Sequence, residues 1–255
     1  MEVGFRSDKG RKRSNNEDAC FVLLPEKVYM VADGVGGGNA GEIASRTAVN
    51  EIVNYIKQNP IKKAANKYAI VNYLQDCIDK TNETIFENAG KYEENKGMAT
   101  TAAIVHIRDG VAYIANVGDS RVYLFRDGKL KQLTEDHTYV NTLLNAGIIS
   151  PEQAAHDSRK NVITKALGAE ETVEPDFFQV DIIKDDIFLL CTDGLYDELN
   201  DSAIVDILQN NSSMSDICAD MIEKANASGG HDNITTISLK VTDCLLYTSP
   251  SPRDV

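Results

Sequence analysis

The sequence lacks any long apolar run. No segment approaches the roughly 18 uncharged apolar residues that a membrane-spanning helix needs. The basic residues near the N-terminus are not followed by the apolar stretch of a secretory leader. We therefore expect a cytoplasmic protein with no membrane partner, and its 42% hydrophobic content suffices for a packed core.

Paired cysteines and clustered basic residues are also missing. The five cysteines are scattered, with no Cys-x-x-Cys pair and no histidine at zinc-finger spacing, so they are interpreted as reduced, packed thiols. A formal charge of −13 argues against binding of nucleic acid, which depends on clustered Lys and Arg. Most of the carboxylates are expected on a solvated surface, which leaves a minority to build a site.

Predicted strands and helices come in blocks. Three short strands open the chain as a β-meander, two helices follow, and four more strands are divided by the turns Asp109-Gly110 and Asp127-Gly128. A parallel doubly wound sheet would need strict alternation, so the pattern favours two antiparallel sheets covered by helices. The predicted strands span 2–7, 19–24, 28–32, 101–107, 111–117, 121–126, 130–133, 177–182, 186–191 and 234–241.

No internal repeat or linker divides the chain, so we expect one domain over residues 1–241, with an inserted helical flap at 137–168. The tail needs separate treatment. Residues 244–254, CLLYTSPSPRD, can be back-translated into a transposon-type sequencing adapter. We expect this tail to be an artefact and exclude it from the fold.

Three acidic residues each stand beside an apolar strand at a predicted turn: Asp33, Asp193 and Asp232. Glycine next to such residues lets carboxylates converge without a collision of their backbones. One Asp-Gly pair is usually only a turn. Three such residues, each next to a strand that looks buried, indicate a shared site.

Converging carboxylates repel and raise one another's pKa unless a cation lies among them. Oxygen ligands without a cysteine or histidine cluster favour Mg²⁺ or Mn²⁺ over zinc. Two such ions can bind a bridging water, deprotonate it and clamp the oxygens of an in-line displacement at phosphorus. The pattern therefore points to phosphate-ester hydrolysis.

Two further segments agree with this chemistry. Arg13 offers a guanidinium for bidentate phosphate binding and is followed by Glu17 and Asp18. Alone, such a turn is more often a surface salt bridge. Asp119, in Gly-Asp-Ser-Arg between two strands, could equally belong to a plain hairpin.

Five motifs occur in order: Arg-x-x-Asn-Glu-Asp, Ala-Asp-Gly-x-Gly-Gly-x-x-Ala-Gly-Glu, Gly-Asp-Ser-Arg, Thr-Asp-Gly-Leu and Asp-Asn. This set resembles the metal-dependent (type 2C) protein phosphatase family in its compact bacterial form, over residues 2–241. Each motif alone is weak, but the ordered set is specific. The resemblance implies a four-layer α-β-β-α sandwich of class α+β, in which two stacked antiparallel sheets are flanked by helix pairs and the metals lie at one end.

The resemblance also implies roles for single residues. Asp33 would bridge two ions, Mn²⁺ or Mg²⁺, and the Gly34 carbonyl would bind one of them. Asp193 and Asp232 would bind the other ion.

The remaining implied roles concern water, phosphate and a third ion. Glu17 and Asp18 would hold metal-bound waters, and Arg13 would hold the substrate phosphate. Asp119 would contribute to a third, looser ion. Arg13, Asp18 and Asp33 are thus the catalytic candidates, and the flap is expected to be mobile and to influence substrate choice.

The expected reaction is hydrolysis of phosphoserine and phosphothreonine in other proteins by a hydroxide that bridges two metal ions. We expect a monomer that opposes a serine/threonine kinase and acts on that kinase and its substrates. A regulator of a sigma factor is an alternative substrate. A non-catalytic relative that keeps the fold as a binding module is an alternative of another class.

One feature departs from the family pattern. Many relatives carry a histidine in the Asp-Gly loop, where this chain has Val35 and Gly38. The general acid is therefore open, with a metal-bound water favoured and His137 or His231 as candidates.

A dinucleotide-binding loop is a rival interpretation of the glycines at 36–41, which match Gly-x-Gly-x-x-Gly. It fails because no second strand ending in an acid follows about 20 residues later. The loop also lacks the Gly-Lys-Ser/Thr ending of a nucleotide P-loop.

Overall fold

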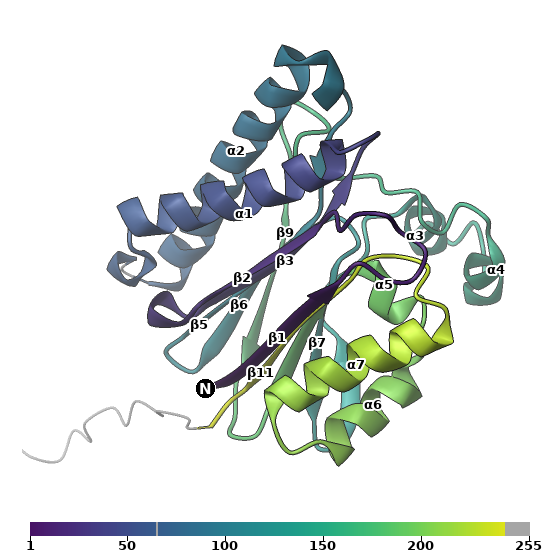
Figure 1. The fold of residues 1–255 in the computed structure, drawn as a ribbon. Coiled ribbons are helices and arrows are strands. Elements are labelled where there is room, and N and C mark those ends of the chain that lie inside the picture. Colours follow the sequence, from purple (N-terminus) through teal and green to yellow (C-terminus); the bar gives the residue numbers. More distant parts are fainter. Residues whose placement is uncertain (65, 243–255) are drawn as a thin grey trace, which may run out of the picture.

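Two antiparallel sheets are stacked face to face in the computed structural model, which describes residues 1–64 and 66–242 (Figure 1). The first sheet has the strand order β1-β11-β10-β7-β8, and the second has the order β2-β3-β5-β6-β9, with β4 added beside β3. The predicted adapter tail, 244–254, lies outside the described residues. The strands of the first sheet are β1 (Glu2–Asp8), β11 (Ile234–Lys240), β10 (Ile187–Cys191), β7 (Arg121–Arg126) and β8 (Lys129–Gln132). Those of the second are β2 (Asp18–Leu23), β3 (Val28–Val35), β4 (Ala99–Thr100), β5 (Ala102–Arg108), β6 (Val111–Val117) and β9 (Asp176–Asp181).

A pair of helices covers the outer face of each sheet (Figure 1). The helices α1 (Ala40–Gln58) and α2 (Lys67–Lys91) lie over the second sheet, and α6 (Asp201–Asn210) and α7 (Met214–Ser228) lie over the first. The predicted four-layer α-β-β-α sandwich is thus confirmed. Shorter helices are α3 (Tyr139–Asn145), α4 (Pro151–His156), α5 (Asp193–Tyr196) and the 3-10 turns at Leu24–Glu26, Ile61–Lys63 and Glu93–Asn95.

The central strands are apolar on both faces because both faces are buried. In β10, Phe188 and Leu190 point into the core between the sheets, whereas Leu189 points into the core under α6 and α7. In β3, Tyr29 likewise points into the core between the sheets, and Met30 points into the core under α1 and α2. Since side chains alternate along a strand, a layer on each side requires the unbroken apolar runs seen in the sequence.

Both predicted Asp-Gly turns join paired strands. Asp109 and Gly110 have φ values of 51° and 80° between β5 and β6, and Asp127 and Gly128 have 51° and 74° between β7 and β8. Two consecutive positive φ values define the type I′ turn, whose twist suits a two-residue hairpin. These local pairings were predictable from the turn residues.

The predicted opening β-meander is wrong. Strand β1 pairs with β11, which is contributed by the far end of the described chain, and only β2 and β3 pair with each other. Residues 9–17 therefore cross from one sheet to the other. The turn at 118–120 makes a second crossing, because β6 and β7 belong to different sheets, so it is not a hairpin.

The predicted flap, 137–168, contains α3 and α4 and ends in a turn rather than in a regular strand. Its two ends are held together by an isolated bridge between Thr138 and Ile163. A second isolated bridge joins Leu167 to Thr100, the last residue of β4. Among the described residues, no helix is both long enough and apolar enough to span a membrane.

Candidate active site

The crossings at residues 9–17 and 118–120 and the start of α5 lie at one end of the sandwich, near α3 (Figure 1). These segments surround a cleft of about 260 Å³. Its lining includes every residue predicted for the site except Asp18. The lining residues are Arg13, Glu17, Asp33, Gly34, Val35, Gly36, Asp119, Asn161, Ile163, Asp193, Asp232 and Asn233.

Asp33 lies within β3, not at the turn that the sequence predicted. The short strand β4 pairs with Gly34 and Val35, so β3 continues for two residues beyond Asp33. The Asp33 backbone N–H donates to Oγ1 of Thr101 at 2.8 Å. Because that N–H is satisfied inside the sheet, the carboxylate is held on a rigid strand that borders the cleft.

Gly34 and Gly41 bring three backbone segments into contact. The Gly34 N–H donates to the carbonyl of Glu17 at 3.1 Å. A Cβ on Gly34 would overlap the Gly41 carbonyl and would lie 2.6 Å from the Glu17 carbonyl. The glycines of the loop therefore serve close packing of the start of α1 against the site.

Asp193 is the first residue of the short helix α5, directly after β10. The preceding residue, Thr192, donates from Oγ1 to Oδ2 of Asp18 at 2.8 Å. Asp18 is paired with Asp33 across β2 and β3, so it lies behind the cleft rather than on its wall. Asp18 and Asp33 on one sheet are thus brought close to Asp193, which follows a strand of the other sheet.

Asn233 ties the N-terminal crossing to the start of β11. Its Oδ1 accepts from the Glu17 N–H at 2.8 Å, and its Nδ2 donates to the carbonyls of Lys9 and Asn15 at 2.9 Å each. Next to it, Asp232 accepts from Arg13 at 2.6 Å. Asn233 belongs to the Asp-Asn motif, but its structural role was not predicted, because its partners lie more than 200 residues away.

Burial and mutual repulsion raise the pKa of the site carboxyls. Burial raises the pKa of Asp18 to about 7, although side-chain hydrogen bonds with Thr235 and Thr192 lower it, and burial together with nearby acids raises that of Asp119 to about 8. Burial and the charge of Asp232 raise the pKa of Asp193 to about 6. Burial, followed by the charge of Asp193, raises the pKa of Asp33 well above its ordinary value. Such a group of acids favours a bound cation.

The donor set fits a hard divalent cation. It consists of carboxylate and carbonyl oxygens, and the buried Oδ1 atoms of Asp18 and Asp193 have no hydrogen-bond partner. Within residues 1–64 and 66–242, no three acidic, histidine or cysteine side chains already converge closely enough to cage an ion. Mg²⁺ and Mn²⁺ prefer oxygen donors and keep part of their shell as water.

Neither candidate histidine lines the cleft. His137 is buried, and its Nδ1 accepts from a backbone N–H. The imidazole of His231 is exposed and lies 2.7 Å from Glu198. The structure therefore places no imidazole of the described chain where it could protonate a leaving group in the cleft.

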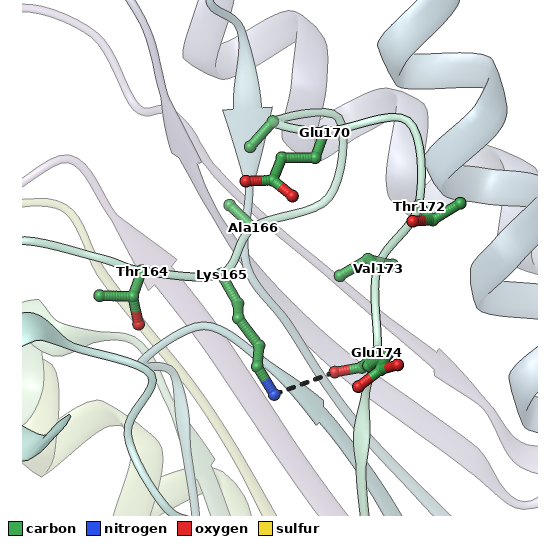
Figure 2. Close-up of a pocket in the computed structure, with 8 residues that line it drawn as sticks. Thr164, Lys165, Ala166, Glu170, Thr172, Val173 and Glu174 are labelled. Carbon is green, nitrogen blue, oxygen red and sulfur yellow. Dashed lines mark hydrogen bonds between the residues drawn. The ribbon is translucent and has the colours of Figure 1, made fainter.

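A second pocket of about 330 Å³ lies between the end of the flap and the segment before β9 (Figure 2). Lys165 extends through it and donates to the Glu174 carbonyl at 3.2 Å (Figure 2). None of the predicted site residues lines this pocket. It does not belong to the acidic cleft.

Comparison with known proteins agrees with the fold and the motifs. Residues 8–237 match the family model described as protein phosphatase 2C. The serine/threonine phosphatase stp of Listeria welshimeri is 39% identical over 240 residues, which cover 93% of this chain and 94% of that protein.

Solved structures extend the comparison. The serine/threonine phosphatase Stp1 from Staphylococcus aureus superimposes with a TM-score of 0.88 at 31% identity, covering 95% of this chain and 96% of that one. The catalytic domain of the phosphatase PstP, solved with two manganese ions, has a TM-score of 0.83 at 32% identity and covers 94% of this chain and 98% of its own. This chain therefore belongs to the protein phosphatase 2C family of metal-dependent serine/threonine protein phosphatases.

Proposed function

We propose that the acidic cleft hydrolyses phosphoserine and phosphothreonine esters in other proteins by attack of water at phosphorus. One observation carries this proposal. Carboxyls on separate segments, the buried Asp119 and the half-buried Asp33 and Asp193, line one cleft together with the partly exposed Arg13. The acids suit cations, and the guanidinium suits a phosphate.

In this proposal Asp33 and the Gly34 carbonyl would hold one cation, and Asp33, Asp193 and Asp232 would hold a second. When bound, two such ions supply an activated water and charge neutralisation for the phosphoryl group. The family likeness to a phosphatase with two manganese ions supports this assignment. Mn²⁺ and Mg²⁺ both match the oxygen donors.

The other residues orient water and phosphate. Glu17 and Asp18 would accept hydrogen bonds from water around the cations, and Asp119 would serve a third, looser ion. Arg13 presents two parallel N–H donors to the phosphate oxygens. We propose that the leaving serine or threonine oxygen takes its proton from water, since no imidazole lines the cleft in the described chain.

The proposed substrates are phosphorylated proteins. Phosphoserine and phosphothreonine in proteins are made by kinases, so an enzyme that removes them opposes a serine/threonine kinase. We propose that this kinase and its substrates are the targets. The cleft holds no feature specific to a sigma-factor regulator, so that alternative carries no separate proposal.

Release of phosphate from matched phosphoserine, phosphothreonine and phosphotyrosine peptides tests the proposal. With Mn²⁺ we expect turnover of the first two peptides, and chelation by EDTA should abolish it. Restoration by added Mn²⁺ would exclude damage by the chelator. Turnover that persists after full metal removal, or that is confined to phosphotyrosine, would contradict the proposed reaction.

A further inference from the structure

His137 is buried at the start of the flap segment, residues 137–168, with a relative exposure of 8%. It was one candidate for the general acid, but it does not line the cleft. Its ring and its backbone instead contact the turn that carries Asp119. The contact joins the flap to the acidic site.

Two reciprocal hydrogen bonds make this contact. The His137 backbone N–H donates to the Gly118 carbonyl at 3.0 Å. The Gly118 N–H donates back to Nδ1 of His137 at 3.0 Å. Because Nδ1 accepts a hydrogen bond from the Gly118 N–H, it carries no proton, and the proton of the neutral ring is on Nε2. Burial also lowers the pKa of His137, which agrees with a neutral ring.

The opposite ring edge faces Asp176 on β9. The Nε2 atom of His137 lies 3.3 Å from Oδ2 of Asp176, too poorly aligned for a hydrogen bond. Lys165 holds the other carboxylate oxygen of Asp176 at 3.3 Å. The ring is thus oriented mainly by the bond from Gly118, with Asp176 as a weaker partner.

Side chains from three other parts of the chain contact the turn at Gly118 and Asp119. Gly118 has φ of 101°, a conformation that other residues rarely adopt, and it makes the crossing from β6 to β7. The side chain of Asn116 donates to its carbonyl at 3.2 Å. On the other side of the turn, the Tyr196 hydroxyl donates to the Asp119 carbonyl at 3.0 Å. His137 is the partner of the Gly118 N–H.

The same histidine holds the base of the flap. Its carbonyl accepts from the Thr164 N–H at 2.7 Å, and the neighbouring Thr138 bridges to Ile163. Ile163 lines the cleft together with Asn161. His137 therefore connects the base of the flap directly to Gly118.

We propose that His137 is a positioning residue that fixes the Gly118–Asp119 turn and couples it to the base of the flap. It acts through hydrogen bonds and does not touch the substrate. The consequence for catalysis rests on the function proposed for Asp119, whereas the positioning itself does not. The two parts can be tested separately.

Two substitutions of His137 distinguish the contact made by Nδ1 from the contact made by Nε2. In His137→Asn the Oδ1 atom can take the place of Nδ1 and accept from Gly118. In His137→Gln the amide reaches the place of Nε2 instead, and the Gly118 N–H loses its acceptor. The pair is matched in polarity, so a difference between the variants reports the Gly118 bond.

Hydrogen exchange by NMR of the metal-free protein measures positioning without any turnover. We expect the Gly118 amide to exchange about tenfold faster in His137→Gln than in the wild type, relative to the Leu189 amide in β10. His137→Asn should stay within a few-fold of the wild type. Equal protection in both variants, or equal loss in both, would overturn the proposal. If His137→Gln does not fold, loss of protection in a folded His137→Asn still overturns it.

The Mn²⁺ requirement tests the link to function. Residues that orient a metal ligand typically change metal affinity by about 10- to 100-fold when they are replaced. We expect His137→Gln to need about tenfold more Mn²⁺ for half-maximal rate, with KM for the phosphopeptide unchanged. An unchanged Mn²⁺ requirement with faster Gly118 exchange would separate the turn from catalysis and overturn the functional part alone. Absence of wild-type turnover would instead contradict the proposed function and leave the exchange result standing.

Discussion

The guanidinium of Arg13 donates from Nη2 to Oδ2 of Asp232 across 2.6 Å at the mouth of the cleft. This hydrogen bond, which outweighs the effect of burial, raises the pKa of Arg13. Both side chains are partly exposed, so the pair contributes little to stability. We expect its importance to be functional, because we propose that Asp232 binds a cation and Arg13 binds a phosphate. A cation bound to Asp232 would then compete with Arg13 and free its N–H groups for the phosphate.

Replacement of Arg13 should therefore weaken substrate binding. We expect Arg13→Ala to lower kcat/KM for a phosphopeptide by about 10- to 100-fold, since a hydrogen bond to a charged group contributes roughly 1.5–3 kcal/mol. Steady-state kinetics at saturating Mn²⁺ measures this, and most of the loss should fall on KM. Arg46→Ala is a matched control, because Arg46 pairs with Glu42 on the surface of α1. A KM that equals the wild-type value in Arg13→Ala would remove Arg13 from the phosphate site.

Asp193→Asn should abolish turnover without unfolding the protein. The substitution removes a charge that is repelled by Asp232 and Asp33, so the melting temperature in EDTA should equal or exceed that of the wild type. The increase in melting temperature on addition of Mn²⁺ should disappear, since a ligand stabilises only the state that binds it. Scanning calorimetry with and without Mn²⁺ measures both effects.

Asp127→Asn is the control for that experiment, because Asp127 lies in an exposed hairpin turn where Asn is equally suitable. It should keep both turnover and the Mn²⁺-dependent stabilisation. Wild-type turnover by Asp193→Asn would exclude Asp193 from the metal site.

The stability of the metal-free protein should fall as pH rises. The folded-state pKa is about 6 for Asp193, about 7 for Asp18 and about 8 for Asp119, each raised from 3.8, so the folded state binds protons that the unfolded chain has released. The contribution of these groups is thus complete below about pH 4 and is lost as pH rises through 6 to 8. We expect the melting temperature in EDTA to decrease between about pH 5 and about pH 8.

Two comparisons make the pH experiment specific. Saturating Mn²⁺ should remove the decrease, because the cation replaces the protons as the counter-charge. Asp119→Asn should flatten the upper part of the curve in EDTA. A melting temperature that rises over the same pH range would show that these carboxyls are ionised without cost in the folded protein.

Local pattern accounts for the parts of the fold that the sequence predicted. The β5–β6 and β7–β8 hairpins follow from Asp-Gly turns, and β10 follows from an apolar run of strand length. The pairing of β1 with β11 was not predicted, because it joins residues more than 200 positions apart and neither segment carries a sequence pattern that indicates its partner. The end of β3 was missed because β4, contributed by Ala99–Thr100, extends it.

The acidic residues of the site were predictable because their type and their neighbours are chemical signals in themselves. The supports of the site were not. Nothing near His137 in the sequence indicates that its ring accepts from Gly118, and Thr101 gives no sign that it satisfies the N–H of Asp33. These contacts depend on the stacking of two sheets, which local pattern does not specify.

Two glycines of the Asp-Gly-x-Gly-Gly loop should differ in their response to alanine. A Cβ on Gly34 would overlap the Gly41 carbonyl, whereas a Cβ on Gly37 would meet no atom within 4 Å. Overpacking of this kind costs roughly 1–3 kcal/mol, and here the obstacle is backbone that cannot rotate away. We expect Gly34→Ala to lower the free energy of unfolding by at least that amount, and Gly37→Ala to change it by less than about 0.5 kcal/mol. Urea unfolding of both metal-free variants measures the difference, and equal stability would show that Gly34 and Gly41 are not in backbone contact.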